Sequence, residues 1–123
     1  MRLSELERPF ICTSITATTI EETVTAIKRA EYHGARAFEV HLPLLGFPDP
    51  APLARLTDAT AAPVYATCRR GAFYELLGAD VTVDVSDDER AERLLAAVEA
   101  GCDGVDLELD AFDPTGGSNC IVT

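Results

Sequence analysis

Residues 34–42 read Gly-Ala-Arg-Ala-Phe-Glu-Val-His-Leu, and residues 101–109 read Gly-Cys-Asp-Gly-Val-Asp-Leu-Glu-Leu. Each segment starts at a glycine of the kind that ends a helix and continues into a run with polar side chains at alternate positions. A helix followed directly by a strand, twice in one chain, indicates repeated βα units. We therefore predict an α/β fold in which right-handed crossovers build a parallel sheet and helices cover its outer face.

The rest of the chain continues this alternation. Short runs rich in apolar, β-branched or aromatic residues predict strands at residues 10–15, 37–42, 63–68 and 104–109. Thr19 and Ser86 each stand three residues before a glutamate, which is the spacing of a capping box, and both are expected to start helices. A shorter helix is expected to begin near Ala51.

Two parts of the chain give weaker signals. Residues 71–85 offer a helical turn at 73–77 and an alternating, strand-like run at 81–85. Residues 111–123, which contain two adjacent glycines, are interpreted as a loop that leads to missing sequence. We treat residues 1–123 as a single partial domain.

The helix that begins after Ser86 is expected to bury an apolar face made of Ala91, Leu94, Leu95 and Val98.

Polar residues recur on one side of the expected strands, among them Glu39, His41, Asp106 and Glu108. In an open sheet with helices on both faces the strands read as continuous apolar runs, and these strands do not. Polar positions at strand ends suit the interior of a barrel near its ligand-binding mouth, although solvated edge positions would give the same pattern. We therefore predict parallel βα units that form the first half of a (β/α)8 TIM-type barrel.

Composition excludes several classes of function. The chain of 123 residues carries 21 acidic against 10 basic side chains and a formal charge of -11, which repels nucleic acid and anionic membrane surfaces. Its apolar stretches are too short to span a bilayer, and it has no apolar leader, so we expect a cytoplasmic protein. The histidines and cysteines show no zinc-ligand spacing.

Four short motifs, in order, resemble successive strands of the type I 3-dehydroquinate dehydratase family. They are Pro-Phe-Ile-Cys-Thr-Ser at 9–14, Phe-Glu-Val-His at 38–41, Ala-Thr-Cys-Arg at 66–69 and Val-Asp-Leu-Glu-Leu at 105–109. The family carries Glu-x-Arg on its second strand, Thr-x-Arg at the end of its third and Asp-x-Glu on its fourth. The resemblance covers nearly the whole chain, and the ordered set is more specific than any one motif.

The resemblance implies dehydration of 3-dehydroquinate to 3-dehydroshikimate in aromatic amino-acid biosynthesis, through a lysine Schiff base assisted by a histidine. It implies a small-molecule substrate and no metal or organic cofactor. By position, the substrate-binding residues would be Ser14, Glu39, His41 and Arg69. The family's catalytic lysine and histidine come from later strands, so none of the catalytic residues is expected within this chain. Its single lysine, Lys28, falls on an outer helix.

His41 departs from the family, which has arginine at this position. An imidazole offers fewer donors and no permanent charge, and it could equally be a satisfied interior histidine. Two alternatives to a 3-dehydroquinate dehydratase also remain open. One is a non-catalytic half-barrel that associates through open strand edges, for example as a homodimer. The other is a different Schiff-base barrel such as an aldolase, although the chain lacks a glycine-rich phosphate loop.

Overall fold

The computed structural model describes residues 3–79, 85–108 and 120–122, the last of these for the backbone only. The strands are β1 (Cys12–Ile15), β2 (Ala37–His41), β3 (Val64–Thr67), β4 (Gly104–Leu107) and β5 (Cys120–Val122). The helices are the 3-10 turn η1 (Leu3–Glu5), α1 (Ile20–Tyr32), α2 (Pro50–Asp58), α3 (Gly71–Leu76) and α4 (Asp87–Glu99).

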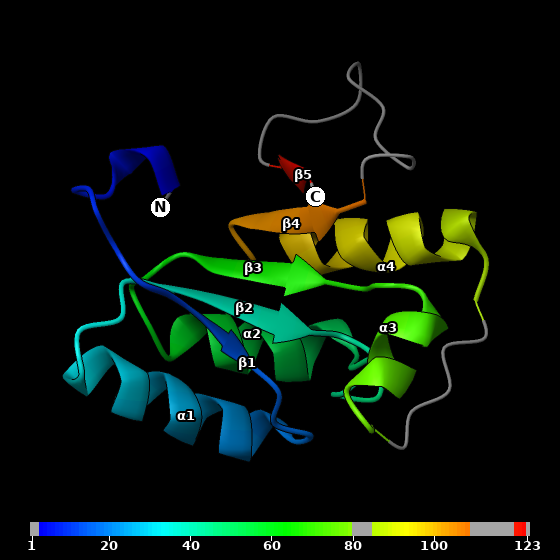
Figure 1. The fold of residues 1–123 in the computed structure, drawn as a ribbon, viewed down its shortest axis with the longest axis horizontal. Helices are drawn as coiled ribbons and strands as arrows, with labels where there is room; N and C mark the ends of the chain where they lie inside the picture. The colour runs from blue at the N-terminus through cyan, green and yellow to red at the C-terminus, as the bar shows by residue number, and fades with distance from the viewer. Residues whose placement is uncertain (1–2, 80–84, 109–119, 123) are drawn as a thin grey trace.

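The strands form one sheet in chain order, β1-β2-β3-β4-β5, and every neighbouring pair is parallel (Figure 1). Helices connect β1 to β2, β2 to β3 and β3 to β4, which is the arrangement of repeated βα units. Sequential order and parallel pairing are those of half a (β/α)8 barrel. The predicted fold class is confirmed.

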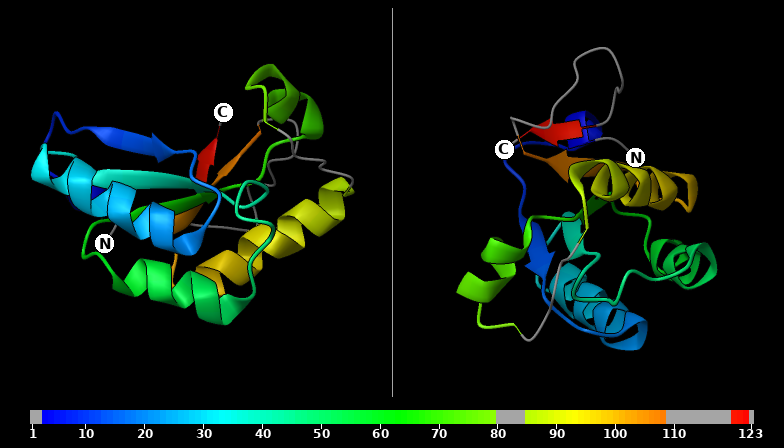
Figure 2. Two further views of the ribbon diagram at one scale, coloured as in Figure 1. Left: turned by 90° about the horizontal axis from the view of Figure 1, so that it is seen from below. Right: turned by 90° about the vertical axis from the view of Figure 1, so that its right-hand side faces the viewer.

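The hydrophobic core lies between the outer face of the sheet and α1, α2 and α4 (Figure 2). On β2, Phe38 and Val40 are almost completely buried on this face, whereas Glu39 between them points to the other side. The helices contribute apolar side chains that are at most 3% exposed, namely Ile27, Leu53, Leu56 and Leu94. One face of the sheet is therefore packed, and polar side chains occupy the opposite face.

The predicted helix starts are confirmed by their capping bonds. Thr19 Oγ1 accepts a hydrogen bond from the backbone N–H of Glu22 at 3.1 Å, and Ser86 Oγ accepts one from Glu89 at the same distance. At the other end of α4, Gly101 has a φ of +119°. A Cβ at this glycine would also lie 2.7 Å from Thr57 Oγ1, so both backbone and packing require glycine.

The segment that was least regular in sequence forms α3, which lies beyond the carboxyl ends of β2 and β3 (Figure 1). The helical turn predicted at residues 73–77 is confirmed for residues 73–76, since α3 covers Gly71–Leu76 and Leu77 is its C-cap. Of the strand predicted at 81–85, residues 81–84 lie outside the described residues. The short helix therefore covers the end of the sheet at which the polar strand residues gather.

The predicted buried face of α4 is confirmed for Leu94 and wrong for Ala91, Leu95 and Val98. Arg90, Leu94 and Ala97 are at most 3% exposed, whereas Leu95 is 61% and Val98 38% exposed. The predicted and the observed buried stripes share Leu94 and otherwise lie side by side on the helix. The guanidinium of Arg90 makes hydrogen bonds beneath the helix, and these bonds favour the rotation that buries an arginine in place of Leu95.

The interpretation of residues 111–123 as a loop was wrong for Cys120–Val122, which form β5 beside β4. Isoleucine and valine favour extended backbone, and the edge of β4 offers hydrogen-bonding groups that a further strand can pair with. Residues 111–119 lie outside the described residues.

Candidate functional site

Side chains from three adjacent strands meet on the face of the sheet opposite the helices. In the parallel register Ser14 on β1 lies beside Glu39 on β2, and His41 on β2 lies beside Thr67 on β3. Because side chains alternate between the two faces, Glu39 and His41 point to the same side, and their neighbours in register point there too. We call Ser14, Glu39, His41 and Thr67 the Glu39 cluster.

Glu39 is the acceptor at the centre of this cluster. Ser14 Oγ donates to Glu39 Oε1 at 2.8 Å, and Thr67 Oγ1 donates to Glu39 Oε2 at 2.9 Å. His41 Nε2 lies 3.2 Å from Oε1. The hydrogen bond from His41 is the main cause that holds the pKa of Glu39 well below its ordinary value, against the opposing effect of partial burial. Glu39 is therefore a carboxylate at neutral pH.

His41 is 3% exposed and has a partner at each ring nitrogen. Its Nε2 lies 3.1 Å from Ser14 Oγ, and its Nδ1 lies 3.1 Å from the hydroxyl of Tyr74 on α3. The two interpretations of His41 are thus compatible in geometry. The ring is satisfied within the fold, and it also contacts two of the other residues that sequence reasoning placed in the site.

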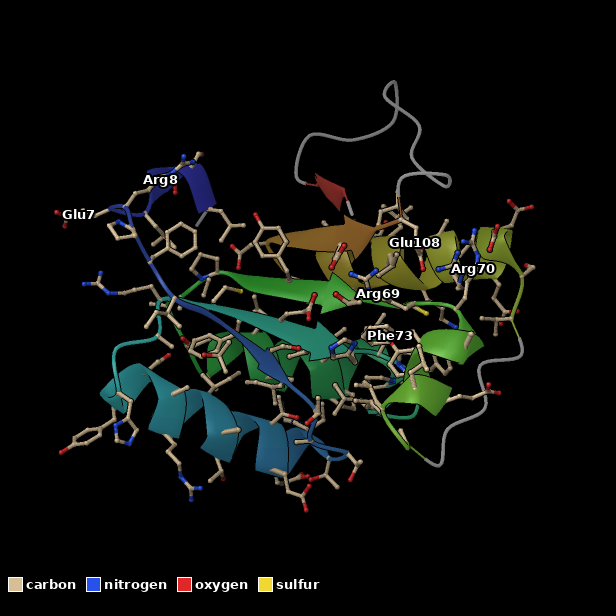
Figure 3. All side chains as sticks on the ribbon, in the orientation of Figure 1. Glu7, Arg8, Arg69, Arg70, Phe73 and Glu108 are labelled. Carbon is tan, nitrogen blue, oxygen red and sulfur yellow. The ribbon has the colours of Figure 1, made fainter. Side chains whose placement is uncertain are left out.

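Arg69 lies two residues beyond the end of β3, and its side chain lies on the sheet beside Phe73 of α3 (Figure 3). Its Nη2 donates to Asp106 Oδ2 on β4 at 3.1 Å, and its Cζ lies 5.1 Å from the centre of the Phe73 ring. A quarter of the Arg69 side chain remains exposed. Asp106 neighbours Thr67 in register, which places Arg69 and its partner next to the Glu39 cluster.

Four residues that belong to this region were not among the predicted site residues. The period of two placed Asp106 on the polar side of its strand without assigning it to the site, and the same period on β3 could have found Thr67. Phe73 and Tyr74 lie on α3, and their approach to His41 and Arg69 had no sequence signal, because it depends on how α3 packs across the strand ends.

A second group of charged side chains lies at the same end of the sheet but is built differently. Arg90 on α4 donates from Nη1 to Glu108 Oε2 and from Nη2 to Asp87 Oδ1, each at 2.8 Å. The same Nη1 also donates to the carbonyl oxygen of Cys68 at 2.8 Å. We call Arg90, Asp87 and Glu108 the Arg90 cluster. It fastens α4 to the ends of β3 and β4.

Parallel βα units with polar side chains gathered at the carboxyl ends of the strands define a domain of the (β/α)8-barrel class. Comparison with models of protein families identifies the type I 3-dehydroquinase family over residues 11–116, and the chain belongs to this family. The comparison with individual curated proteins found no match. Among the described residues, every helix is too short or too polar to cross a membrane.

Proposed function

We propose that this chain supplies the substrate-binding half of a cytoplasmic lyase that dehydrates 3-dehydroquinate to 3-dehydroshikimate in the shikimate pathway. The observation that carries the proposal is the convergence of Ser14, Glu39 and His41 into one hydrogen-bonded cluster, with Arg69 beside it. Family membership supports the same reaction class.

The side chains suit the polar groups of such a substrate. Arg69 is partly exposed, and its planar guanidinium can bind a carboxylate through paired hydrogen bonds. The Glu39 carboxylate accepts hydrogen bonds and can therefore receive a substrate hydroxyl in place of Ser14 or Thr67. Ser14, which is exposed, can donate to or accept from the same ligand. In this proposal the four residues bind and orient the substrate.

The amine for Schiff-base chemistry is proposed to come from polypeptide outside residues 1–123, together with the histidine acid/base. Lys28 is poorly placed for this role, because it lies on α1 and its Nζ donates to the carbonyl oxygen of Ala59 after α2. That contact is on the helix side of the sheet, whereas the Glu39 cluster is on the opposite face. No metal or organic cofactor takes part in the proposed reaction.

A calorimetric titration with 3-dehydroquinate tests the binding role. We expect saturable binding, and a cyclohexane polyol that lacks the carboxylate should bind more weakly because it cannot pair with Arg69. Equal binding of the two compounds, or no binding of 3-dehydroquinate, would contradict the proposal.

Reductive trapping tests the placement of the amine. Incubation of the chain with 3-dehydroquinate and borohydride should leave its mass unchanged, because Schiff-base formation needs an amine in the substrate pocket. A covalent adduct on Lys28 would show that our assignment of this lysine is wrong.

A further inference from the structure

Two aromatic residues of α3, Phe73 and Tyr74, lie against His41. The His41 ring stacks on Phe73 with centroids 5.8 Å apart and planes 18° apart, and it meets Tyr74 edge-on with centroids 5.7 Å apart. Phe73 also carries the Arg69 guanidinium on its face (Figure 3). A short helix at the strand ends thus contacts two of the proposed substrate-binding residues at once.

The hydrogen bonds of Tyr74 determine where its hydroxyl proton can go. Tyr74 is completely buried, and its oxygen accepts the backbone N–H of Arg69 at 3.2 Å. Since that contact uses the oxygen as an acceptor, the phenolic proton is free to point at His41 Nδ1, 3.1 Å away. Burial raises the pKa of Tyr74, so the phenol keeps this proton at neutral pH.

The opposite side of the imidazole requires the complementary arrangement. The proton of Ser14 is donated to Glu39, so the serine oxygen faces His41 Nε2 as an acceptor. Glu39 Oε1 also lies 3.2 Å from Nε2 and accepts only. A proton on Nε2 satisfies both oxygens, whereas a proton on Nδ1 would leave the Nε2 lone pair facing a carboxylate.

We propose that Tyr74 is a positioning residue that holds neutral His41 in its Nε2–H tautomer, with Phe73 fixing the plane of the ring. His41 then presents a hydrogen-bond donor to the Glu39 cluster. Resting on the proposed function, this arrangement favours a ligand oxygen that accepts a hydrogen bond at this place, such as a ketone or hydroxyl oxygen.

The tautomer can be measured directly by nitrogen NMR on protein labelled with 15N-histidine. The chain has two histidines, and the second, His33, is an exposed residue at the end of α1, which serves as an internal reference. At about pH 8, where an ordinary imidazole is neutral, we expect His41 to show a protonated Nε2 and an acceptor Nδ1. A predominant Nδ1–H form, or a doubly protonated ring, would overturn the proposal.

Tyr74→Phe tests the cause, because it removes one hydroxyl and keeps the ring. In the folded variant we expect the His41 Nδ1 signal to move because its hydrogen-bond donor is lost, whereas Tyr32→Phe, at a tyrosine that is 87% exposed, should leave the His41 signals unchanged. His41 signals identical to those of the wild type in folded Tyr74→Phe would refute the role. If this variant does not fold, the wild-type tautomer alone still decides the proposal.

Measuring ligand affinity distinguishes a failure of this inference from a failure of the proposed function on which it rests. If 3-dehydroquinate binds, Tyr74→Phe should weaken its affinity about fivefold, the effect of one net hydrogen bond. An unchanged affinity would contradict the link between tautomer and ligand. Absence of any binding to the wild type would contradict the proposed function, whereas the tautomer measurement would remain valid.

Discussion

The Glu39 cluster and the Arg90 cluster both place charged side chains at the carboxyl end of the sheet, yet they differ in the charge of the partners and in the exposure of the central side chain. In the first, the Glu39 carboxylate receives neutral donors from neighbouring strands, and its side chain is 22% exposed. In the second, the Arg90 guanidinium is 2% exposed and bonds two carboxylates and a backbone carbonyl. The first cluster has the partial exposure and neutral partners that a binding site needs, whereas the second holds α4 against the ends of β3 and β4.

The difference shows that charge at the strand ends does not by itself identify a site. A ligand can replace a hydroxyl at Glu39 without leaving a buried charge unpaired, because the donors are neutral. Displacing a partner of Arg90 would leave an uncompensated cation in the interior, which is costly. Accessibility and the charge of the partners therefore separate the two clusters, and the following predictions test this separation.

The largest effect on stability is expected from Arg90→Met. The substitution keeps much of the buried volume but leaves Glu108 and the Cys68 carbonyl without their donor, so the free energy of unfolding should fall by about 3 kcal/mol. Denaturant unfolding followed by circular dichroism measures this change.

Arg93→Met provides the matched control on the same helix. The Arg93 side chain is 44% exposed, lies 3.9 Å from Glu89 and packs over Phe47, so its loss should cost less than about 1 kcal/mol. Equal destabilisation by the two variants would show that the buried Arg90 cluster contributes no more to stability than the exposed pair of Arg93 and Glu89.

Arg69→Ala should act mainly on binding. Loss of a charged hydrogen bond to the substrate carboxylate should weaken 3-dehydroquinate affinity by about 2 to 4 kcal/mol. Calorimetry measures this change, and Arg55→Ala, an exposed arginine on α2, is the control. Unchanged affinity in folded Arg69→Ala would remove this residue from the site.

Acid should weaken both clusters. The pKa of Glu39 is lowered chiefly by its bond from His41, and hydrogen bonds from Arg70 and Arg90 lower that of Asp87 to about 2. A lowered carboxyl pKa adds stability above its unfolded value and loses it as the pH falls through the folded value. Unfolding free energy should therefore decline below about pH 4.5, the ordinary glutamate value.

Two variants divide this acid response between the clusters. Glu39→Gln and Asp87→Asn should each flatten the decline, and Glu39→Gln should leave the part below about pH 4 that belongs to Asp87. Denaturant titrations at a series of pH values test this division. An acid response identical to that of the wild type in both variants would show that neither carboxylate is stabilised by its partners.

The smallest effect is expected from Glu89→Gln. Its partner Arg93 is 3.9 Å away, and both side chains are about half exposed, so loss of the charge should change stability by less than about 0.5 kcal/mol. Thermal unfolding measures the change. A larger loss would mean that exposed pairs on α4 contribute more than their geometry indicates.

The sequence predicted the parts of the molecule that follow from periodicity and capping. The alternation in residues 37–42 placed Glu39 and His41 on one face, and the capping spacing located the starts of α1 and α4. It could not assign the buried stripe of α4, because Arg90 and Leu95 compete for the interior and only the partners at Cys68 and Glu108 decide between them.

The aromatic contacts of α3 were also beyond sequence reasoning. Phe73 and Tyr74 reach His41 from more than thirty positions away in the chain, and their approach depends on the tertiary packing of a helix of six residues. Likewise, β5 was missed because a strand of three residues gives little local signal, and its pairing with β4 cannot be read from the local sequence.

The most direct test of the account is chemical-shift mapping of the chain as 3-dehydroquinate is added. If the Glu39 cluster and Arg69 form the substrate-binding surface, the largest shifts should fall on Ser14, Glu39, His41 and Arg69, with smaller ones around Arg90. Shifts centred on the Arg90 cluster or on the helix face of the sheet, or none at saturating ligand, would contradict the account.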